Sequence, residues 1–173
     1  SPEWRTGSRY LGSTTMTNVG HNYATNLSAA LGMLVRSYDG WRLQQVGMNP
    51  TNGATAADVA SGVWDTFFNQ FFSDYNNASL RSGCTDYIFF RLMNEFNVSS
   101  SSWYNDPTNF KIAWRKVYNI AQANGVADKF IWVWSPEAVG LDPTPYYPGD
   151  EYVDWVGLSV YPHTWLSGTN NLP

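Results

Sequence analysis

Residues 87–97 read YIFFRLMNEFN, a run of aromatic and branched apolar side chains that ends in Asn94 and Glu95. This composition predicts a buried strand, Tyr87–Met93, with polar side chains just beyond its C-terminal end. The other short apolar runs that predict strands and are closed by turn residues are Leu43–Met48, Phe130–Trp134 and Val153–Val160.

Helical patterns alternate with these runs. A helix is predicted near 56–72, where Thr55 and Asp58 have the spacing of a capping box. A second helix is predicted near 108–124, opened by Asp106-Pro107. Their apolar faces are predicted to be Val59, Val63, Phe67 and Phe71 in the first helix, and Phe110, Trp114, Val117 and Ala121 in the second.

Strands alternating with helices predict a parallel α/β protein. A doubly wound sheet normally carries a glycine-rich phosphate loop, and neither G-x-G-x-x-G nor G-x-x-x-x-G-K-[ST] occurs in the sequence. Polar residues at strand C-termini favour the alternative, a (β/α)8 TIM barrel. A complete barrel takes about 250 residues, so 173 residues supply five to six of its eight units. We expect residues 1–173 to be one incomplete barrel domain, clearest in 43–165, with 1–40 unassigned.

The amino-acid composition disfavours several classes of function for this protein. Charged residues are 14% and aromatic residues 17%, and the net charge of −4 argues against a nucleic-acid-binding protein, which needs a basic face. No apolar run reaches the length of a membrane span. Two histidines and one cysteine, Cys84, do not form a known metal-ligand spacing, and no cofactor motif is present. Abundant aromatic and hydroxyl side chains suit a neutral, hydroxyl-rich ligand such as a polysaccharide.

The sequence also favours an extracellular location, with few Lys and Glu residues and no leader at the start of the sequence. Three Asn-x-Ser triplets are candidate glycosylation sites, at Asn26, Asn77 and Asn97. We therefore expect a secreted glycoprotein.

Glu95 is the first candidate for chemistry. A period of two places Arg91 and Glu95 on the same face of the strand, toward the barrel axis. A carboxylic acid walled by aromatic side chains at a strand end is suited to general-acid duty, and Asn94 beside it can donate to a substrate hydroxyl. The alternative is a structural Arg91–Glu95 ion pair at the barrel mouth.

Three segments, read together, resemble glycoside hydrolase family 26. They are 91–97 (RLMNEFN) with Trp103, then 130–136 (FIWVWSP), then 146–161 (YYPGDEYVDWVGLSVY), and they look like strands four, five and six of that family. The resemblance covers about residues 43–165. It implies a retaining (β/α)8 glycosidase, best known as a β-mannanase, with catalytic acids after strands four and seven.

The resemblance also implies residue roles. Glu95 would be the general acid/base, with Arg91 fixing its carboxylate, Trp103 lining a sugar subsite and Tyr161 near the nucleophile. This chain departs from the family in having Asn94 where His is usual, and in a serine-rich insertion at 98–102. The nucleophile would follow strand seven, outside this sequence.

The remaining candidates lie at or beyond strand ends. Glu137 is the only plausible second carboxylate within the sequence, although the family would make it a binding residue. Trp134 and Trp165 can stack on a sugar, His163 can line the mouth, and Asp154 is expected at the opposite end of the barrel. The two tryptophans inside strands, Trp132 and Trp155, are expected in the core or facing helices.

Two functions follow. The first is a secreted hydrolase of a β-linked polysaccharide, with mannan favoured, in which Glu95 protonates the leaving oxygen. The second is a glycosidase-derived, non-catalytic protein that binds carbohydrate or builds an extracellular assembly, which Asn94 and the serine-rich insertion favour. Fold alone does not decide between them.

Overall fold

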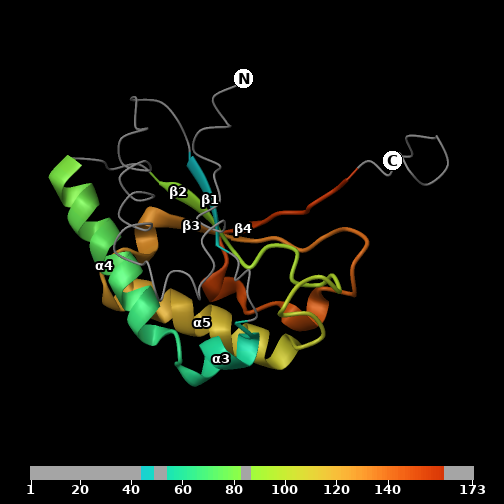
Figure 1. Ribbon diagram of the computed structural model, residues 1–173. Helices are drawn as coiled ribbons and strands as arrows, with labels where there is room; N and C mark the ends of the chain where they lie inside the picture. The colour runs from blue at the N-terminus through green and yellow to red at the C-terminus, as the bar shows by residue number, and fades with distance from the viewer. Residues whose placement is uncertain (1–43, 49–53, 83–86, 162–173) are drawn as a thin grey trace.

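The computed structural model describes residues 44–48, 54–82 and 87–161. Within them, four strands form one sheet in the order β1-β2-β3-β4, so that neighbours in the sheet are neighbours along the chain (Figure 1). All three pairings are parallel. The strands are β1 (Gln44–Met48), β2 (Ile88–Leu92), β3 (Phe130–Trp134) and β4 (Trp155–Val156).

The four predicted strands and their order are confirmed, and only their lengths differ. The largest difference is in the last strand, where the run Val153–Val160 reduces to Trp155–Val156. Pairing nevertheless continues as an isolated parallel bridge between Glu137 and Ser159. Parallel strands in sequential order, joined by helical crossovers, are the arrangement of a (β/α)8 barrel of which this chain forms a part.

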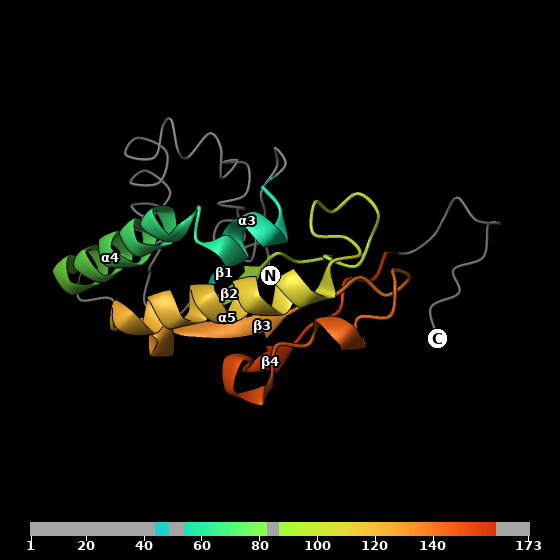
Figure 2. The same cartoon turned by 90° about the horizontal axis from the view of Figure 1, so that it is seen from below.

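Three α-helices lie on one side of the sheet: α3 (Ala56–Ser61), α4 (Asp65–Ser82) and α5 (Pro107–Ala123) (Figure 2). The second predicted helix is confirmed, since Asp106 caps it through a hydrogen bond to the amide of Asn109 and Pro107 is its first residue. Its four predicted apolar residues are all buried. The described residues also form short 3-10 helices: η2 (Ala127–Lys129), η3 (Thr144–Tyr146) and η4 (Asp150–Tyr152).

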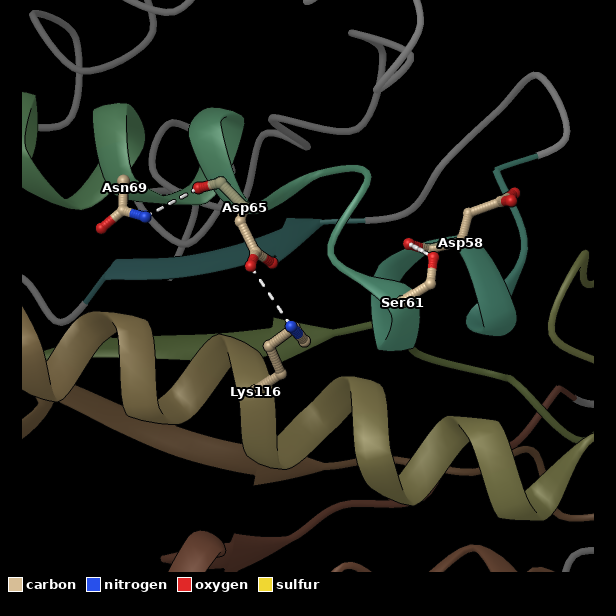
Figure 3. A network of polar contacts seen from close by, with 5 residues as sticks. All are labelled: Asp58, Ser61, Asp65, Asn69 and Lys116. Atoms are coloured by element: carbon tan, nitrogen blue, oxygen red, sulfur yellow. Dashed lines mark hydrogen bonds and ion pairs between the residues drawn. The ribbon is translucent and has the colours of Figure 1, made fainter.

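The first predicted helix is two helices. Gly62 adopts a left-handed conformation with φ of 97° and ends α3, and α4 begins at Asp65. A helix broken at this point turns Val63 outward, so Val63 is 69% exposed rather than part of the predicted stripe. Figure 3 shows how α4 is then tied to α5, by an ion pair of 3.2 Å between Lys116 and Asp65.

The two faces of the sheet carry different side chains. On the helix side, the buried rings of Phe90 and Trp132 pack against Phe72 of α4, and Trp132 also contacts Trp114 of α5. This contact set confirms that Trp132 is a helix-facing core residue. The helix side is therefore an aromatic core that positions the strand ends.

The other face of the sheet points toward the barrel axis. Trp155 does not face the helices, because its indole is on this face, where it is 60% exposed and in edge contact with Phe89. The register explains this placement: Trp155 pairs with Val133, which is one residue out of phase with the helix-facing Trp132.

The capping box at the start of α3 is present as predicted. The Thr55 hydroxyl accepts from the Asp58 amide at 3.1 Å, and the Asp58 carboxylate accepts from the Thr55 amide at 2.9 Å. The hydrogen bond from the Thr55 amide, and after it the one that the Thr55 hydroxyl donates to the same carboxylate at 2.8 Å, hold the pKa of Asp58 below its ordinary value of 3.8. The stabilisation from Asp58 is therefore full above that value and is lost as pH falls through the lowered pKa.

Replacing the cap residue, Thr55→Ala, is expected to lower the free energy of unfolding by about 1 kcal/mol, because an amide of the first turn loses its acceptor. The pKa of Asp58 should rise toward its ordinary value in the same variant, which an NMR titration of the carboxyl measures. Thr66→Ala, at an exposed position in α4, is the matched control and should leave both quantities unchanged. An unmoved Asp58 titration in Thr55→Ala would contradict this account.

Candidate active site

The segment after β2 turns sharply and carries Glu95. Met93 and Glu95 both have positive φ, 49° and 59°, a region that residues other than glycine rarely occupy. The turn is held at both residues, because the Met93 amide donates to the Met48 carbonyl at 2.9 Å and the Glu95 amide donates to the Ser135 carbonyl at 2.8 Å. Such strained residues cluster at functional sites, and this one sets Glu95 at the C-terminal end of the sheet.

The Glu95 carboxylate contacts Tyr161, the last residue that the structure describes. Tyr161, which follows β4, donates its hydroxyl to Oε1 of Glu95. A pocket of about 150 Å³ opens beside this pair, and its lining is mostly polar. Besides Glu95 it is lined by Met93, Asn94, Val98, Ser100, Ser101 and Ser102.

This pocket includes the serine-rich insertion, so the departure from the family pattern lies next to the candidate acid. Asn94 also lines the pocket and is largely buried. Two of the serines are engaged with the protein: the Ser101 hydroxyl accepts from the Trp103 amide, and the Ser102 hydroxyl donates to the Ala54 carbonyl. Glu95, Asn94 and Tyr161 are thus brought together.

Arg91 points to the same end of the sheet but does not contact Glu95. Its Nη2 donates to the hydroxyls of Ser135 at 2.7 Å and Ser159 at 3.0 Å. Among the described residues there is no Arg91–Glu95 ion pair, so the expectation that Arg91 holds this carboxylate is corrected. The reason is the positive φ of Met93 and Glu95, which ends the alternation on which the shared face depended.

Sequence reasoning missed Ser159 as a partner of Arg91. A signal was available, since Trp155, Gly157 and Ser159 alternate along one run and therefore share the axis side. The hydrogen bonds of Arg91 link the ends of three successive strands. This network fixes the layer of side chains directly beneath the mouth.

Glu137 is held by its own turn. Its carboxylate Oε2 accepts from the Val139 amide at 2.8 Å, and the residue is 7% exposed. Its main chain is also bound, with the amide donating to Oδ1 of Asn97 and the carbonyl accepting from Nδ2 of Asn97. These contacts place Glu137 as a structural residue rather than as a second carboxylate facing Glu95.

Two tryptophans that we expected at the mouth pack inside. Trp103 is 0% exposed, with Nε1 donating to the Ala54 carbonyl at 3.0 Å. Trp134 lies on the helix side, in contact with Phe96 and Tyr147, because it is in phase with Trp132. The structure does not bring the indole of Trp103 or of Trp134 to the Glu95 carboxylate.

Burial raises the pKa of the Tyr147 hydroxyl, and the hydrogen bond that this hydroxyl donates to Asp150 raises it further.

The other candidates divide by position. Asp154 precedes β4 and its Oδ2 accepts from the Trp132 amide at 2.8 Å, which fits a structural residue at the N-terminal end of the strand. Asn97 is 0% exposed with its amide hydrogen-bonded to two carbonyls, so the folded chain does not offer it for glycosylation, whereas Asn77 on α4 is exposed. The candidates outside the described residues are Asn26, Cys84, His163 and Trp165.

The part of the chain that the structure describes shows neither a metal-binding cluster nor a membrane-spanning helix. No group of three or more His, Cys, Asp or Glu side chains there is arranged to hold a metal ion. In the same part of the chain, every helix is too short or too polar to pass through a lipid bilayer.

Comparison with known families gives a match over half of the chain. Residues 84–171 match the family described as glycosyl hydrolase family 26, a stretch that contains Glu95, Arg91 and Tyr161. The chain belongs to glycosyl hydrolase family 26. The three quoted segments therefore identify the family correctly from the sequence.

Curated relatives of this family 26 chain are bacterial. It is 35% identical over 83 residues to a mannan endo-1,4-β-mannosidase of Bacillus subtilis strain 168, covering 43% of this chain and 23% of that protein. It is 33% identical over 97 residues to mannan endo-1,4-β-mannosidase A and B of Caldalkalibacillus mannanilyticus, covering 49% and 19%. The chain thus aligns with less than a quarter of the length of these relatives.

Solved structures show the same fold at low sequence identity. A Cellulomonas fimi endo-β-1,4-mannanase double mutant superposes with a TM-score of 0.64 at 21% identity, covering 84% of this chain and 38% of that one. The Bacillus subtilis mannanase man26 gives a TM-score of 0.59 at 21% identity, covering 78% and 48%. The superposition supports the partial (β/α)8 barrel.

Proposed function

We propose that this chain carries the acid/base side of a glycosidase active site that cleaves β-mannan, with Glu95 as the general acid/base. The observation that carries the proposal is the placement of Glu95. Its carboxylate lies at the C-terminal end of a barrel strand, on a turn with positive φ, bonded to the Tyr161 hydroxyl and beside a polar pocket. The mannosidase names of the relatives supply the substrate class.

The chemistry follows from this placement. In the first step a protonated Glu95 donates its proton to the glycosidic oxygen as the nucleophilic carboxylate bonds to the anomeric carbon and the bond from that carbon to the glycosidic oxygen breaks. The ionised Glu95 then accepts a proton from the water that releases the sugar. Tyr161 is suited to orient the carboxylate between the two steps, because its hydroxyl already donates to Oε1. Asn94, at the pocket wall, is proposed to bind a substrate hydroxyl.

Retaining hydrolysis needs a second carboxylate about 5–5.5 Å from the first. Glu137, the only second carboxylate expected within the sequence, has its Oε2 bound by the Val139 amide of its own turn, and the family resemblance makes this position a binding residue. We therefore propose that the nucleophile lies on a part of the barrel outside this sequence, and that the protein is secreted to reach its polysaccharide. The non-catalytic carbohydrate-binding alternative is favoured by Asn94, which stands where His is usual in the family, and by the serine-rich insertion that lines the pocket.

The decisive experiment compares two proteins on β-mannan and on mixed-linkage β-glucan. The complete protein that carries this sequence is expected to hydrolyse mannan with retention at the anomeric carbon, followed by NMR. The 173-residue chain alone is expected to show no turnover, because the strand-seven nucleophile is proposed to lie outside this sequence.

Two results would contradict this proposal. Mannan binding without hydrolysis by the complete protein would support the non-catalytic alternative. Turnover by the 173-residue chain that disappears in its Glu95→Gln variant would place the nucleophile inside the chain, with Glu137 as the candidate.

A further inference from the structure

A single buried side chain joins the turn that carries Glu95 to the segment after β3. Nδ2 of Asn97 donates to the carbonyls of Glu137 at 2.9 Å and Leu141 at 2.8 Å, and its Oδ1 accepts from the Glu137 amide at 2.8 Å. The Asn97 carbonyl also accepts from the Leu141 amide at 2.8 Å. Four hydrogen bonds thus connect one residue to the neighbouring loop, and Asn97 is 0% exposed.

The loop that receives Asn97 is shaped to it. A Cβ added to Gly140 would lie 2.4 Å from Nδ2 of Asn97 and 2.6 Å from its carbonyl oxygen. Separations of this size are too short for a carbon atom, so the loop approaches Asn97 only because residue 140 is glycine. The loop therefore packs closely against Asn97 at Gly140, and a methyl group at position 140 would push the two segments apart.

The same two segments meet again at Glu95. Its amide donates to the Ser135 carbonyl at 2.8 Å, and between Glu95 and Asn97 the ring of Phe96 is fully buried against Phe110 and Trp134. Glu95 is therefore bracketed by contacts to the loop after β3. Because its positive φ is unfavourable for a residue with a Cβ, such contacts are needed to keep it there.

We propose that Asn97 is a positioning residue for Glu95: its hydrogen bonds to Glu137 and Leu141 hold the strained turn in the one conformation that aims the carboxylate at the leaving oxygen. The inference rests on the proposed role of Glu95 as general acid. It predicts that disturbing Asn97 weakens proton donation specifically, because a displaced acid still leaves the rest of the site intact.

The test uses the complete protein and two variants that disturb the contact from opposite sides. Asn97→Asp keeps the shape but sets an acceptor against two carbonyls, and Gly140→Ala adds the methyl group that meets Asn97. Val139→Ala, at an exposed position on the same turn, is the matched control. Thermal melts establish that each variant is folded at the assay temperature.

The readout is kcat/KM on two aryl β-mannobiosides, one with phenol and one with 2,4-dinitrophenol as the leaving group. Phenolate leaves only with proton donation, whereas dinitrophenolate leaves without it. Asn97→Asp and Gly140→Ala are expected to lose on the order of 10- to 100-fold on the phenyl substrate and little on the other. Glu95→Ala should show the same pattern more strongly.

The outcomes separate the two proposals. Equal losses on both substrates in Asn97→Asp and Gly140→Ala, with the expected pattern in Glu95→Ala, would overturn the positioning role and leave the proposed function standing. A Glu95→Ala variant that loses equally on both substrates would overturn the proposed function, and the role of Asn97 with it.

Discussion

Glu95→Gln is expected to lower kcat on β-mannan by about 10²–10⁴-fold in the complete protein, which is the usual contribution of general acid catalysis. Glutamine keeps the shape of the side chain and can still meet the Tyr161 hydroxyl, but it has no proton to give to the leaving oxygen. The loss should fall on kcat more than on KM, because the missing interaction exists in the transition state.

Glu151→Gln is the matched control, since Glu151 is an exposed glutamate in η4, before β4, and this variant should keep the parent rate. A loss in Glu95→Gln no larger than in Glu151→Gln would remove Glu95 from the mechanism.

Phe90→Ala is expected to lower the free energy of unfolding by about 3–5 kcal/mol, the range for removing a buried aromatic ring. Phe90 is fully buried in the middle of β2, and its ring contacts Phe71, Phe72, Phe130 and Trp132, which come from α4 and β3. The cavity would therefore open at the junction of two strands and a helix, where little can move to fill it.

The measurement for Phe90 is the urea concentration at the midpoint of unfolding, with the slope checked for constancy. Tyr87→Ala, just before the same strand and 57% exposed, is the control and should change the free energy by less than about 0.5 kcal/mol. Similar midpoints for the two variants would mean that the helix side of the sheet is not the main core.

The strands and the second helix were predictable because their signals are local. Phe130–Trp134 is bounded by turn residues, and Pro107 with Asp106 fixes the start of α5. The break at Gly62 was missed because the four-residue spacing of Val59, Val63 and Phe67 continues through it in the sequence. A glycine with φ of 97° overrides that spacing, and only the packing of α3 and α4 shows that it does.

The site was predictable only in part. The position of Glu95 follows from its place at a strand end, which the sequence shows directly. The absence of an Arg91–Glu95 contact was not predictable, because it depends on the positive φ of Met93 and Glu95, and neither residue type favours that conformation. The burial of Trp103 depends on the Ala54 carbonyl, 49 residues earlier in the chain, and such distant pairs leave no pattern in one sequence.

The sequential order of the strands affects how the chain can fold while it is being synthesised. Each described ladder joins a strand to the one synthesised just before it, so β2, β3 and β4 each find a partner already present when they leave the ribosome. The aromatic side of the sheet needs no residue later than Trp132 to bring Phe72, Phe90 and Phe130 together. The order of these contacts thus allows this layer to assemble in the direction of translation.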